Sequence, residues 1–338
     1  MVDRKVGILV NPLDPAYPGR DLHRMYPFLR LLLPALLLLL PTRAQTLAER
    51  LGYRPDEKIL ILNGDDTGMC HTANQATLDC LREGLMTCAT IMVPCPWFPE
   101  IAAHAKANPA SDFGLHLVQT SEWKGYRWGP VASRDQVPGL LDPDGYLWSE
   151  APQVYAKASP REALLESRAQ IRKALAAGID VTHLDSHMGV LQYQPAYLEV
   201  YRQLAVEFDL PVRMAAQADF DKAGMPHWRA KFAADGILFT DDFVHDMGYS
   251  KPEAVKAFWM RRLAELKPGV TEIFIHAGRP TEELKSITGS WAVRSAEFET
   301  FTHDPEIRAL LDRQGVKRIG YRVIRDLQRS RRKGAAKP

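Results

Sequence analysis

Short apolar segments alternate with longer amphipathic segments along the chain from residue 58 onward. The short segments are rich in aliphatic and β-branched residues, which is typical of strands. The longer segments carry apolar residues three and four positions apart, the spacing of one helix face. Several of them have proline in the first turn, and Gly178 follows one of them, as expected at helix boundaries. This alternation predicts successive βα units around a parallel sheet.

The pattern places the expected elements as follows. The predicted strands are residues 58–63, 86–93, 113–118, 181–185, 212–215, 236–239, 272–276 and 318–323. The predicted helices are residues 74–83, 98–107, 160–177, 195–208, 252–266 and 304–314. Seven or eight such repeats without a glycine-rich phosphate-binding motif favour a barrel over a nucleotide-binding sheet. We therefore predict an α/β fold, a single (β/α)-barrel domain over residues 45–338.

An aromatic-rich insertion interrupts the repeats at about residues 120–158. Its large aromatic residues are Trp123, Tyr126, Trp128, Trp148 and Tyr155. Loops of this length inside compact domains are usually functional. Aromatic faces over a cleft would suit the apolar face of a sugar ring, whereas a small satellite core under the loop is the alternative.

The first 44 residues have the layout of a signal peptide. Residues 31–40 are an apolar run, LLLPALLLLL, with arginines on both sides. The run fits a signal-peptide hydrophobic region, and the small residues Thr42 and Ala44 place cleavage before Gln45. A membrane-spanning helix needs about 20 apolar residues, so we expect no stable span after cleavage. We expect export to the periplasm or the extracellular space. Met25 is an alternative start, which would make residues 1–24 an upstream extension.

Composition, charge and cysteine usage narrow the class of protein. Hydrophobic residues make up 46% and charged residues 25% of the chain, which excludes disordered and low-complexity classes. A net charge of +2 is too balanced for a nucleic-acid-binding protein. The basic run at residues 329–333 is expected to be a frayed, solvated end. The four cysteines lack zinc-finger spacing, and we expect buried free thiols although export would permit disulfides.

Acidic residues and histidines stand at the ends of four predicted strands. They are Asp65 and Asp66 after the first strand, His116 after the third, His183, Asp185 and His187 after the fourth, and His276 after the seventh. The carboxyl ends of the strands form the active site of βα barrels, so these side chains should meet at one mouth. A single such histidine is more often structural, but the convergence of four strands favours a functional site. A later cluster, Asp241, Asp242, His245 and Asp246, could also reach the mouth, but a solvated loop is favoured there.

The chemistry that these residue types support is metal-assisted hydrolysis. One carboxylate and two neutral imidazoles leave positions open on a divalent ion for water and substrate. Of the adjacent carboxylates Asp65 and Asp66, one can bind metal while the other takes the proton of the attacking water. The alternative for this pair is a turn or a helix N-cap. His276 could then protonate a leaving amine.

The motifs NGDDTG, GLHL, THLDSH and IHAG, in this order, resemble those of the YdjC-like carbohydrate deacetylases, the group of chitooligosaccharide and hopanoid-associated deacetylases. The resemblance covers about residues 58–325. It implies a distorted (β/α) barrel of seven to eight strands, related to the polysaccharide deacetylases. It also implies removal of N-acetyl groups from an amino sugar or oligosaccharide with one divalent metal ion, Mg²⁺ or Zn²⁺, and a homodimer.

The resemblance assigns roles residue by residue. The metal ligands would be Asp66, His116 and His187, the general base Asp65 and the general acid His276. Arg213, in LPVRM, resembles a position facing the substrate pocket. Asp185 is interpreted as the acceptor that orients a metal-binding imidazole, and His183 as a supporting or structural residue.

Three departures from the family pattern affect these expectations. Many members read NADDFG and DSHxH, whereas here Gly64 and Thr67 replace alanine and phenylalanine, and Gly189 replaces the second histidine. We therefore expect a different sugar specificity. The HPG-like element reads His276-Ala277-Gly278, which relaxes the turn but keeps the imidazole. The export signal is the third departure, because it would bring the protein to periplasmic or extracellular glycans.

Two other functions compete with deacetylation. Another metal-dependent hydrolase, such as a phosphoesterase, is disfavoured because no phosphate cradle or Arg/Lys cluster lies near the motifs. A non-catalytic glycan-binding protein could use the aromatic insertion, but the complete set of base, ligand and acid candidates argues against it. Two imidazoles with one carboxylate lean towards Zn²⁺, whereas an oxygen-rich shell would suit Mg²⁺.

Overall fold

The computed structural model describes residues 45–245 and 248–335. The predicted signal peptide and Asp246 lie outside the described residues. Within the described ranges, no helix is both long enough and apolar enough to cross a membrane.

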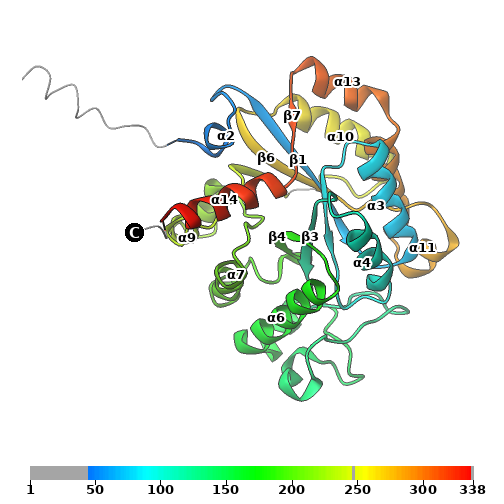
Figure 1. The fold of residues 1–338 in the computed structure, drawn as a ribbon. Coiled ribbons are helices and arrows are strands. Elements are labelled where there is room, and N and C mark those ends of the chain that lie inside the picture. The colour runs from blue at the N-terminus through cyan, green and yellow to red at the C-terminus, as the bar shows by residue number, and fades with distance from the viewer. Residues whose placement is uncertain (1–44, 246–247, 336–338) are drawn as a thin grey trace, which may run out of the picture. The chain divides into compact units, whose positions relative to one another are not determined.

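The strands of the described chain form one parallel sheet that curls into a half-barrel with helices packed around it (Figure 1). They are β1 (Lys58–Thr67), β2 (Cys88–Ile91), β3 (Phe113–Leu117), β4 (Val181–Ser186), β5 (Asp242–Val244), β6 (Gly269–Ile275) and β7 (Lys317–Arg318). Their order is β4-β3-β2-β1-β6-β5, and β7 pairs with β1. Every pairing is parallel, which confirms the predicted distorted βα architecture.

The predicted strands at 212–215 and 236–239 are wrong. These segments close one side of the barrel with an isolated parallel bridge between Leu184 and Val212 and isolated backbone hydrogen bonds instead of ladders. The amide of Arg213 donates to Leu184 in β4 at 2.9 Å, and the amide of Val212 donates to Leu238 at 3.1 Å. The next regularly paired strand is β5, which begins after the predicted segment 236–239 ends. The strand predicted at 318–323 is two residues long, because helix α14 begins at Arg322.

Helices cover the sheet in the order expected from the repeats. They are α2 (Leu47–Arg50), α3 (His71–Glu83), α4 (Phe98–Ala107), α5 (Ala151–Lys157), α6 (Pro160–Ala176), α7 (Pro195–Phe208), α8 (Gln217–Lys222), α9 (Trp228–Ala234), α10 (Pro252–Ala264), α11 (Glu282–Ile287), α12 (Trp291–Thr302), α13 (Pro305–Arg313) and α14 (Arg322–Ala335). All six predicted helices are present. The capping box of Ser159 and Glu162 starts α6, with Pro160 in its first turn.

The basic C-terminal run belongs to α14, which corrects the prediction of a frayed end. Arg329 Nε donates to the carbonyl of Asp209 at 3.4 Å, and Arg332 Nη2 donates to the carbonyl of Asp235 at 3.0 Å. The helix therefore docks on the turns that follow α7 and α9.

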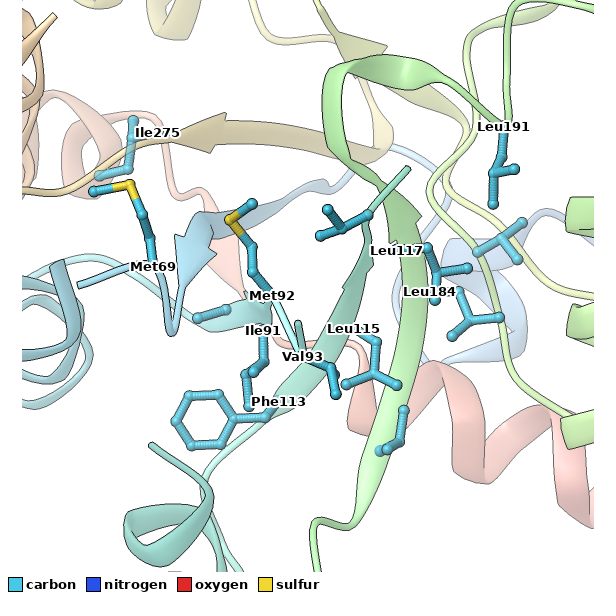
Figure 2. Close-up of a cluster of buried hydrophobic side chains, with 14 of the residues drawn as sticks. Met69, Ile91, Met92, Val93, Phe113, Leu115, Leu117, Leu184, Leu191 and Ile275 are labelled. Atoms are coloured by element: carbon cyan, nitrogen blue, oxygen red, sulfur yellow. The ribbon is translucent and has the colours of Figure 1, made fainter. Parts of the chain in front are cut away.

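The hydrophobic core lies between the sheet and its helices. Figure 2 shows Ile91, Leu115 and Leu184, which come from three neighbouring strands and are fully buried. The four cysteines are buried and unpaired, as predicted. Burial raises the pKa of the Cys70 thiol to about 12, so this thiol is not reactive near neutral pH.

The aromatic residues of the insertion pack mainly against one another and the core. Trp128 is buried, and its indole N–H donates to the carbonyl of Thr120 at 2.9 Å. Trp123 meets the Trp128 ring edge-on, with 5.4 Å between ring centroids. The Trp148 indole N–H donates to the carbonyl of Gly139 at 2.7 Å. These contacts favour the satellite-core interpretation over a sugar-stacking platform.

Candidate active site

The end of β1 turns two consecutive carboxylates towards one cleft. Neighbouring residues of a regular strand point to opposite faces. Here the pairing of β1 with β2 shifts register between Gly64 and Thr67, and Asp66 adopts a left-handed conformation with φ +63°. This conformation is uncommon outside glycine, and aspartate is among the residues that tolerate it best. Asp65 and Asp66 are consequently both buried and both line the cleft.

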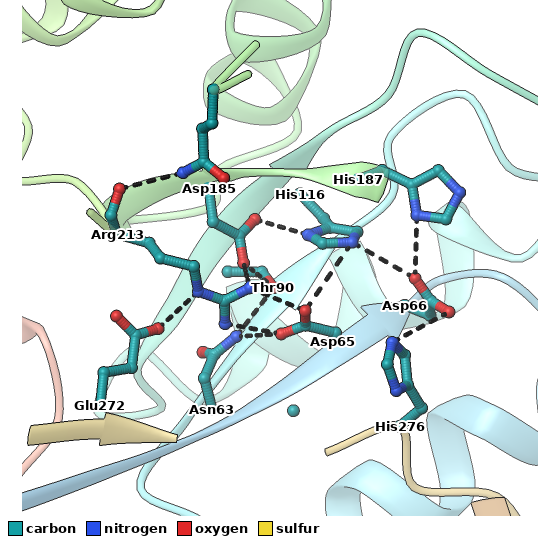
Figure 3. Close-up of polar contacts among 12 residues, drawn as sticks. Asn63, Asp65, Asp66, Thr90, His116, Asp185, His187, Arg213, Glu272 and His276 are labelled. Carbon is teal, nitrogen blue, oxygen red and sulfur yellow. Dashed lines mark hydrogen bonds and ion pairs between the residues drawn. The ribbon is translucent and has the colours of Figure 1, made fainter. Parts of the chain in front are cut away.

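Two imidazoles from different strand ends approach one carboxylate oxygen of Asp66. Asp66 Oδ1 lies 3.4 Å from His116 Nε2 and 3.3 Å from His187 Nδ1 (Figure 3). One ligand atom from each of these residues falls within a 4.8 Å cluster that could hold a metal ion. Asp66 Oδ1 is buried without a hydrogen-bond partner among the described residues. An anionic oxygen left in this state beside two ring nitrogens fits a bound cation.

Each imidazole contacts a further carboxylate through its other ring nitrogen, the one that does not face Asp66. Asp185 Oδ1 lies 2.6 Å from His116 Nδ1, and Glu122 Oε2 lies 3.0 Å from His187 Nε2. Such partners fix the orientation of a metal-binding histidine and the nitrogen that it presents. Asp185 thus contacts a candidate metal-binding imidazole, and its orienting role stays a prediction. Glu122 was missed, because one acidic residue in a loop of mixed polarity gives no distinctive signal.

The same carboxylates control the charge of the imidazoles in the metal-free protein. Burial alone would lower the pKa of His116, but Asp185 and Asp65 outweigh it and raise the pKa to about 10. Burial alone would likewise lower the pKa of His187, but Glu122 outweighs it and raises the pKa to about 9. Both rings are therefore protonated at neutral pH in the metal-free protein, and a bound cation would displace these protons.

We expect Glu122→Ala to weaken metal binding about 10- to 100-fold, since the variant frees the ring of His187. Competition with a metal-sensitive dye would measure the affinity. The matched control is Asp144→Ala, which removes an exposed carboxylate from the same insertion and should bind metal like the unmodified protein. Equal affinities for the two variants would show that Glu122 does not orient His187.

Asp65 is held by a buried arginine. Arg213 Nη1 and Nη2 donate to its two carboxylate oxygens at 2.7 and 2.8 Å. Arg213 also lies 2.9 Å from Asp185 Oδ2 and donates through Nε to Glu272 at 2.7 Å. Burial alone would raise the pKa of Asp65, but Arg213 outweighs it and lowers the pKa to about 2. The predicted pocket-facing Arg213 does line the cleft, where its main contacts are these three carboxylates.

Glu272 is a second residue that sequence reasoning missed. It is fully buried in β6 and accepts hydrogen bonds from Arg213 and from the hydroxyl of Tyr321. A single charged residue directly before the apolar run IFI was the available signal, because a strand buried on both faces rarely carries an unpaired charge.

His276 reaches the opposite side of the carboxylate pair. Its Nε2 lies 4.0 Å from Asp66 Oδ2, and its backbone amide donates to Glu297 at 2.7 Å. Burial lowers the pKa of His276 to about 4, so its ring is neutral at neutral pH. Arg294, from α12, donates to Asp66 Oδ2 at 2.7 Å. Arg294 was missed because the helix that carries it was not predicted.

Glu297 gives the structure a measurable dependence on pH. Burial raises the pKa of this carboxyl to about 7, above its ordinary value of 4.5. Because the folded state favours the protonated carboxyl, its contribution to the free energy of unfolding is fully present below pH 4.5 and is lost as pH rises through 7. In metal-free protein, we expect unfolding free energy to fall by about 2 kcal/mol more between pH 5 and 8 than in Glu297→Gln.

Urea titrations at both pH values would test this difference. Glu299→Gln is the matched control, because it removes an exposed carboxylate from the same helix. That control should keep the pH dependence of the unmodified protein. Parallel pH profiles for Glu297→Gln and the unmodified protein would contradict the account.

Two residues of the VTHLDSHMG segment have structural explanations. The ring of His183 is buried against Tyr321, with 3.9 Å between ring centroids and 11° between their planes, and it does not line the cleft. Gly189 has φ +64°, and a Cβ added there would lie 2.4 Å from the Tyr193 ring. The second histidine of the family pattern is therefore incompatible with this arrangement, because the ring of Tyr193 takes its place.

The cleft thus joins most of the predicted site residues in a cavity of about 330 Å³. Those that line it are Asp65, Asp66, His116, His187, Arg213 and His276, together with Glu122, His245 and Arg294. His245 lies on the cleft wall, so for this residue the structure favours the alternative that its cluster reaches the mouth over the favoured solvated loop. The five large aromatic residues of the insertion do not line this cavity. A curled parallel sheet with carboxylates and imidazoles at the carboxyl ends of its strands defines a βα-barrel protein with a candidate active site at that end of the barrel.

Comparison with known proteins identifies the family. The family model for the YdjC-like protein matches residues 59–313, so the chain belongs to this family, which confirms the resemblance of its motifs. A carbohydrate deacetylase from Thermus thermophilus is 32% identical over 271 residues, covering 78% of this chain and 93% of the relative. One from Brevibacillus brevis is 31% identical over 268 residues, covering 74% and 96%.

A solved structure supports the fold. The chain superposes with a TM-score of 0.67 on a crystal structure from Enterococcus faecalis V583, provisionally named a cellobiose-phosphate cleavage protein. The two are 24% identical, and the match covers 79% of this chain and 99% of that one.

Proposed function

We propose that this protein is a metal-dependent carbohydrate deacetylase that hydrolyses the N-acetyl group of an amino sugar or oligosaccharide. The observation that carries the proposal is the convergence of Asp66, His116 and His187 beside Asp65 in one cleft. Relatives that are more than 30% identical and named carbohydrate deacetylases support the substrate class.

Asp66, His116 and His187 would hold the ion. When bound, a divalent ion would acidify water and polarise the amide carbonyl. Asp65 would then take the proton of the attacking water at a carboxylate oxygen. Arg213 fixes this carboxylate in one orientation with two hydrogen bonds, so the base needs no rearrangement before reaction.

Proton return to the leaving nitrogen follows from the same environment. Because the pKa of Asp65 is about 2, its protonated carboxyl readily gives up the proton that it has taken from water to a stronger base nearby. His276 lines the cleft beyond Asp66 and is neutral before reaction, because burial lowers its pKa to about 4. His276 would therefore accept a proton during turnover and deliver it to the amine as the C–N bond breaks.

Acetate release from N-acetylglucosamine oligomers tests the proposal. We expect metal-loaded protein covering residues 45–338 to release acetate and the free amine in equal amounts, and a chelator to stop the reaction. Phosphate release from sugar phosphates by the same preparation, with no acetate from any N-acetylated sugar, would favour the phosphoesterase alternative. Glycan binding with neither product would favour the non-catalytic alternative.

We also propose that residues 1–44 direct export and are removed. The supporting observation is the apolar run at 31–40 between arginines. N-terminal sequencing of protein secreted by a host cell should begin at Gln45. Retention of the complete segment in the cytoplasm would overturn this assignment.

A further inference from the structure

Arg294 carries one side-chain nitrogen for which the fold provides no partner. Its Nε donates to Ser290 Oγ at 3.1 Å, and its Nη2 donates to Asp66 Oδ2 at 2.7 Å. Its Nη1 is buried and has no hydrogen-bond partner among the described residues. A buried charged donor without a partner is costly, so it calls for a specific explanation. The structure therefore holds a donor that is ready for an acceptor outside the chain.

The guanidinium of Arg294 is held in one position near the start of α12. Arg294 is 8% exposed, and the ring of Trp123 packs against it with 5.6 Å between the ring centroid and Arg294 Cζ. A Cβ at Gly278 would lie 3.3 Å from Arg294 Cβ, so the glycine of IHAG lets the chain after β6 approach closely. Because the guanidinium is planar and rigid, Nη1 cannot turn away unless the hydrogen bonds of Nε and Nη2 break.

The unpartnered nitrogen belongs to the reaction centre. Arg294 lines the catalytic cleft, and its Nη2 binds one oxygen of Asp66, whose other oxygen faces His116 and His187. Among the described residues that line this cleft, the buried polar side-chain atoms without a hydrogen-bond partner are Asp66 Oδ1 and Arg294 Nη1. The first fits a cation. The second, on the planar group that binds the same carboxylate, fits an anionic oxygen beside that cation.

Arg213, the other arginine among the described residues of the cleft wall, has all its side-chain nitrogens engaged. Its Nε donates to Glu272, and its Nη1 and Nη2 donate to Asp65. Its Nη1 also lies 2.9 Å from Asp185 Oδ2. Arg213 therefore serves the protein's own carboxylates, whereas Arg294 has a nitrogen left for a substrate.

We propose that Arg294 is a catalytic residue that donates a hydrogen bond from Nη1 to the acyl oxygen of the substrate as that oxygen becomes negatively charged. The inference rests on the proposed deacetylase function. When the water oxygen bonds to the amide carbon, Asp65 takes a proton from the water, and the electron pair of the C=O bond moves onto the acyl oxygen. When the C–N bond breaks, this pair re-forms C=O, and the nitrogen leaves as an amine with the proton delivered by His276. The acetic acid formed ionises to acetate.

A donor aimed at this oxygen should act mainly on kcat. Hydrogen bonds between charged groups are roughly twice as strong as neutral ones, so the bond strengthens as the oxygen gains charge. Removing one such donor from an active site lowers kcat by about 10²- to 10³-fold. We expect Arg294→Met to lower kcat about 100-fold while KM stays within about threefold, because the loss falls on the transition state.

Acetate binding provides a second readout that needs no turnover. Acetate carries its negative charge on the acyl oxygen, so we expect metal-loaded Arg294→Met to bind it about 10- to 100-fold more weakly in calorimetry. Metal affinity, measured with a metal-sensitive dye, should not fall, because the variant removes a positive charge beside the carboxylate of Asp66. A residue that only orients Asp66 would instead weaken metal binding.

Arg325→Met is the matched control. Arg325 is also a buried arginine paired with an aspartate, and it does not line the cleft. Its partner Asp180 keeps the ion pair with Arg322, so no carboxylate is left alone. This control should keep kcat, KM and acetate affinity within about twofold of the unmodified protein.

Arg294→Lys is a second variant with less risk to folding, because it keeps a cation for Asp66. Its compact ammonium lacks the fork that contacts Asp66 and the acyl oxygen together, so kcat should still fall at least tenfold. Turnover of either folded variant within threefold of the unmodified protein would overturn the inference. A loss that appears in KM alone would also overturn it, as would a loss that follows metal affinity while acetate binds as tightly as before. Absence of hydrolysis by the unmodified protein would overturn the deacetylase function itself, and no variant is needed to recognise that failure.

Discussion

Replacing Asp65 with asparagine should lower kcat by about 10³-fold while the bound metal remains at the level of the unmodified protein. Asparagine has the same shape and can still accept a hydrogen bond from Arg213, but it cannot take a proton from water. Arg213 keeps its contacts with Asp185 and Glu272, so the fold should survive. Turnover and metal content measured on the same preparation test both parts.

A second buried aspartate provides the control for this substitution. Asp112 accepts hydrogen bonds from Thr182 and from the backbone amide of Arg322, and it does not line the cleft. Asp112→Asn should keep kcat close to that of the unmodified protein. Turnover of Asp65→Asn within tenfold of the unmodified protein would mean that another group is the base.

Arg213→Met should lower the free energy of unfolding by about 3–5 kcal/mol, because removing one partner of a buried ion pair leaves charges uncompensated. Three buried carboxylates, those of Asp65, Asp185 and Glu272, lose their shared cation. The effect should be much larger than that of any surface pair. Guanidinium titration of the metal-free proteins measures it.

The comparison pair is Arg168 with Glu207, which is partly exposed. Arg168→Met should cost at most about 1 kcal/mol. Adding Glu272→Gln to Arg213→Met should recover part of the loss, since it removes one of the stranded charges. A loss below 1 kcal/mol for Arg213→Met alone would show that the carboxylates are not held as ions by this arginine.

The sequence predicts the central residues of the site because parallel strands bring their carboxyl ends together. Asp66, His116 and His187 follow three strands whose patterns are clear, and the structure places them in one cluster. The barrel wall at 212–215 and 236–239 was less predictable. Short apolar runs there have the composition of strands, but an isolated bridge and isolated hydrogen bonds replace their ladders.

The partners of the central residues depend on tertiary contacts that no local pattern records. Glu122 reaches His187 from a loop 65 positions earlier, and Arg294 reaches Asp66 across 228 positions. Neither stands in a segment whose period or spacing marks it. Glu272 is the exception, because a charge inside a buried strand calls for a buried partner, and Arg213 is that partner.

Acetate release as a function of added metal tests the central claim most directly. Protein stripped with a chelator and titrated with Zn²⁺ or Mg²⁺ should regain activity in proportion to the added ion and reach its maximum at one ion per chain. Asp66→Asn should regain almost none under the same conditions. Full acetate release from the stripped protein, or equal recovery by Asp66→Asn, would contradict the assignment of Asp66, His116 and His187 as the metal site of a deacetylase.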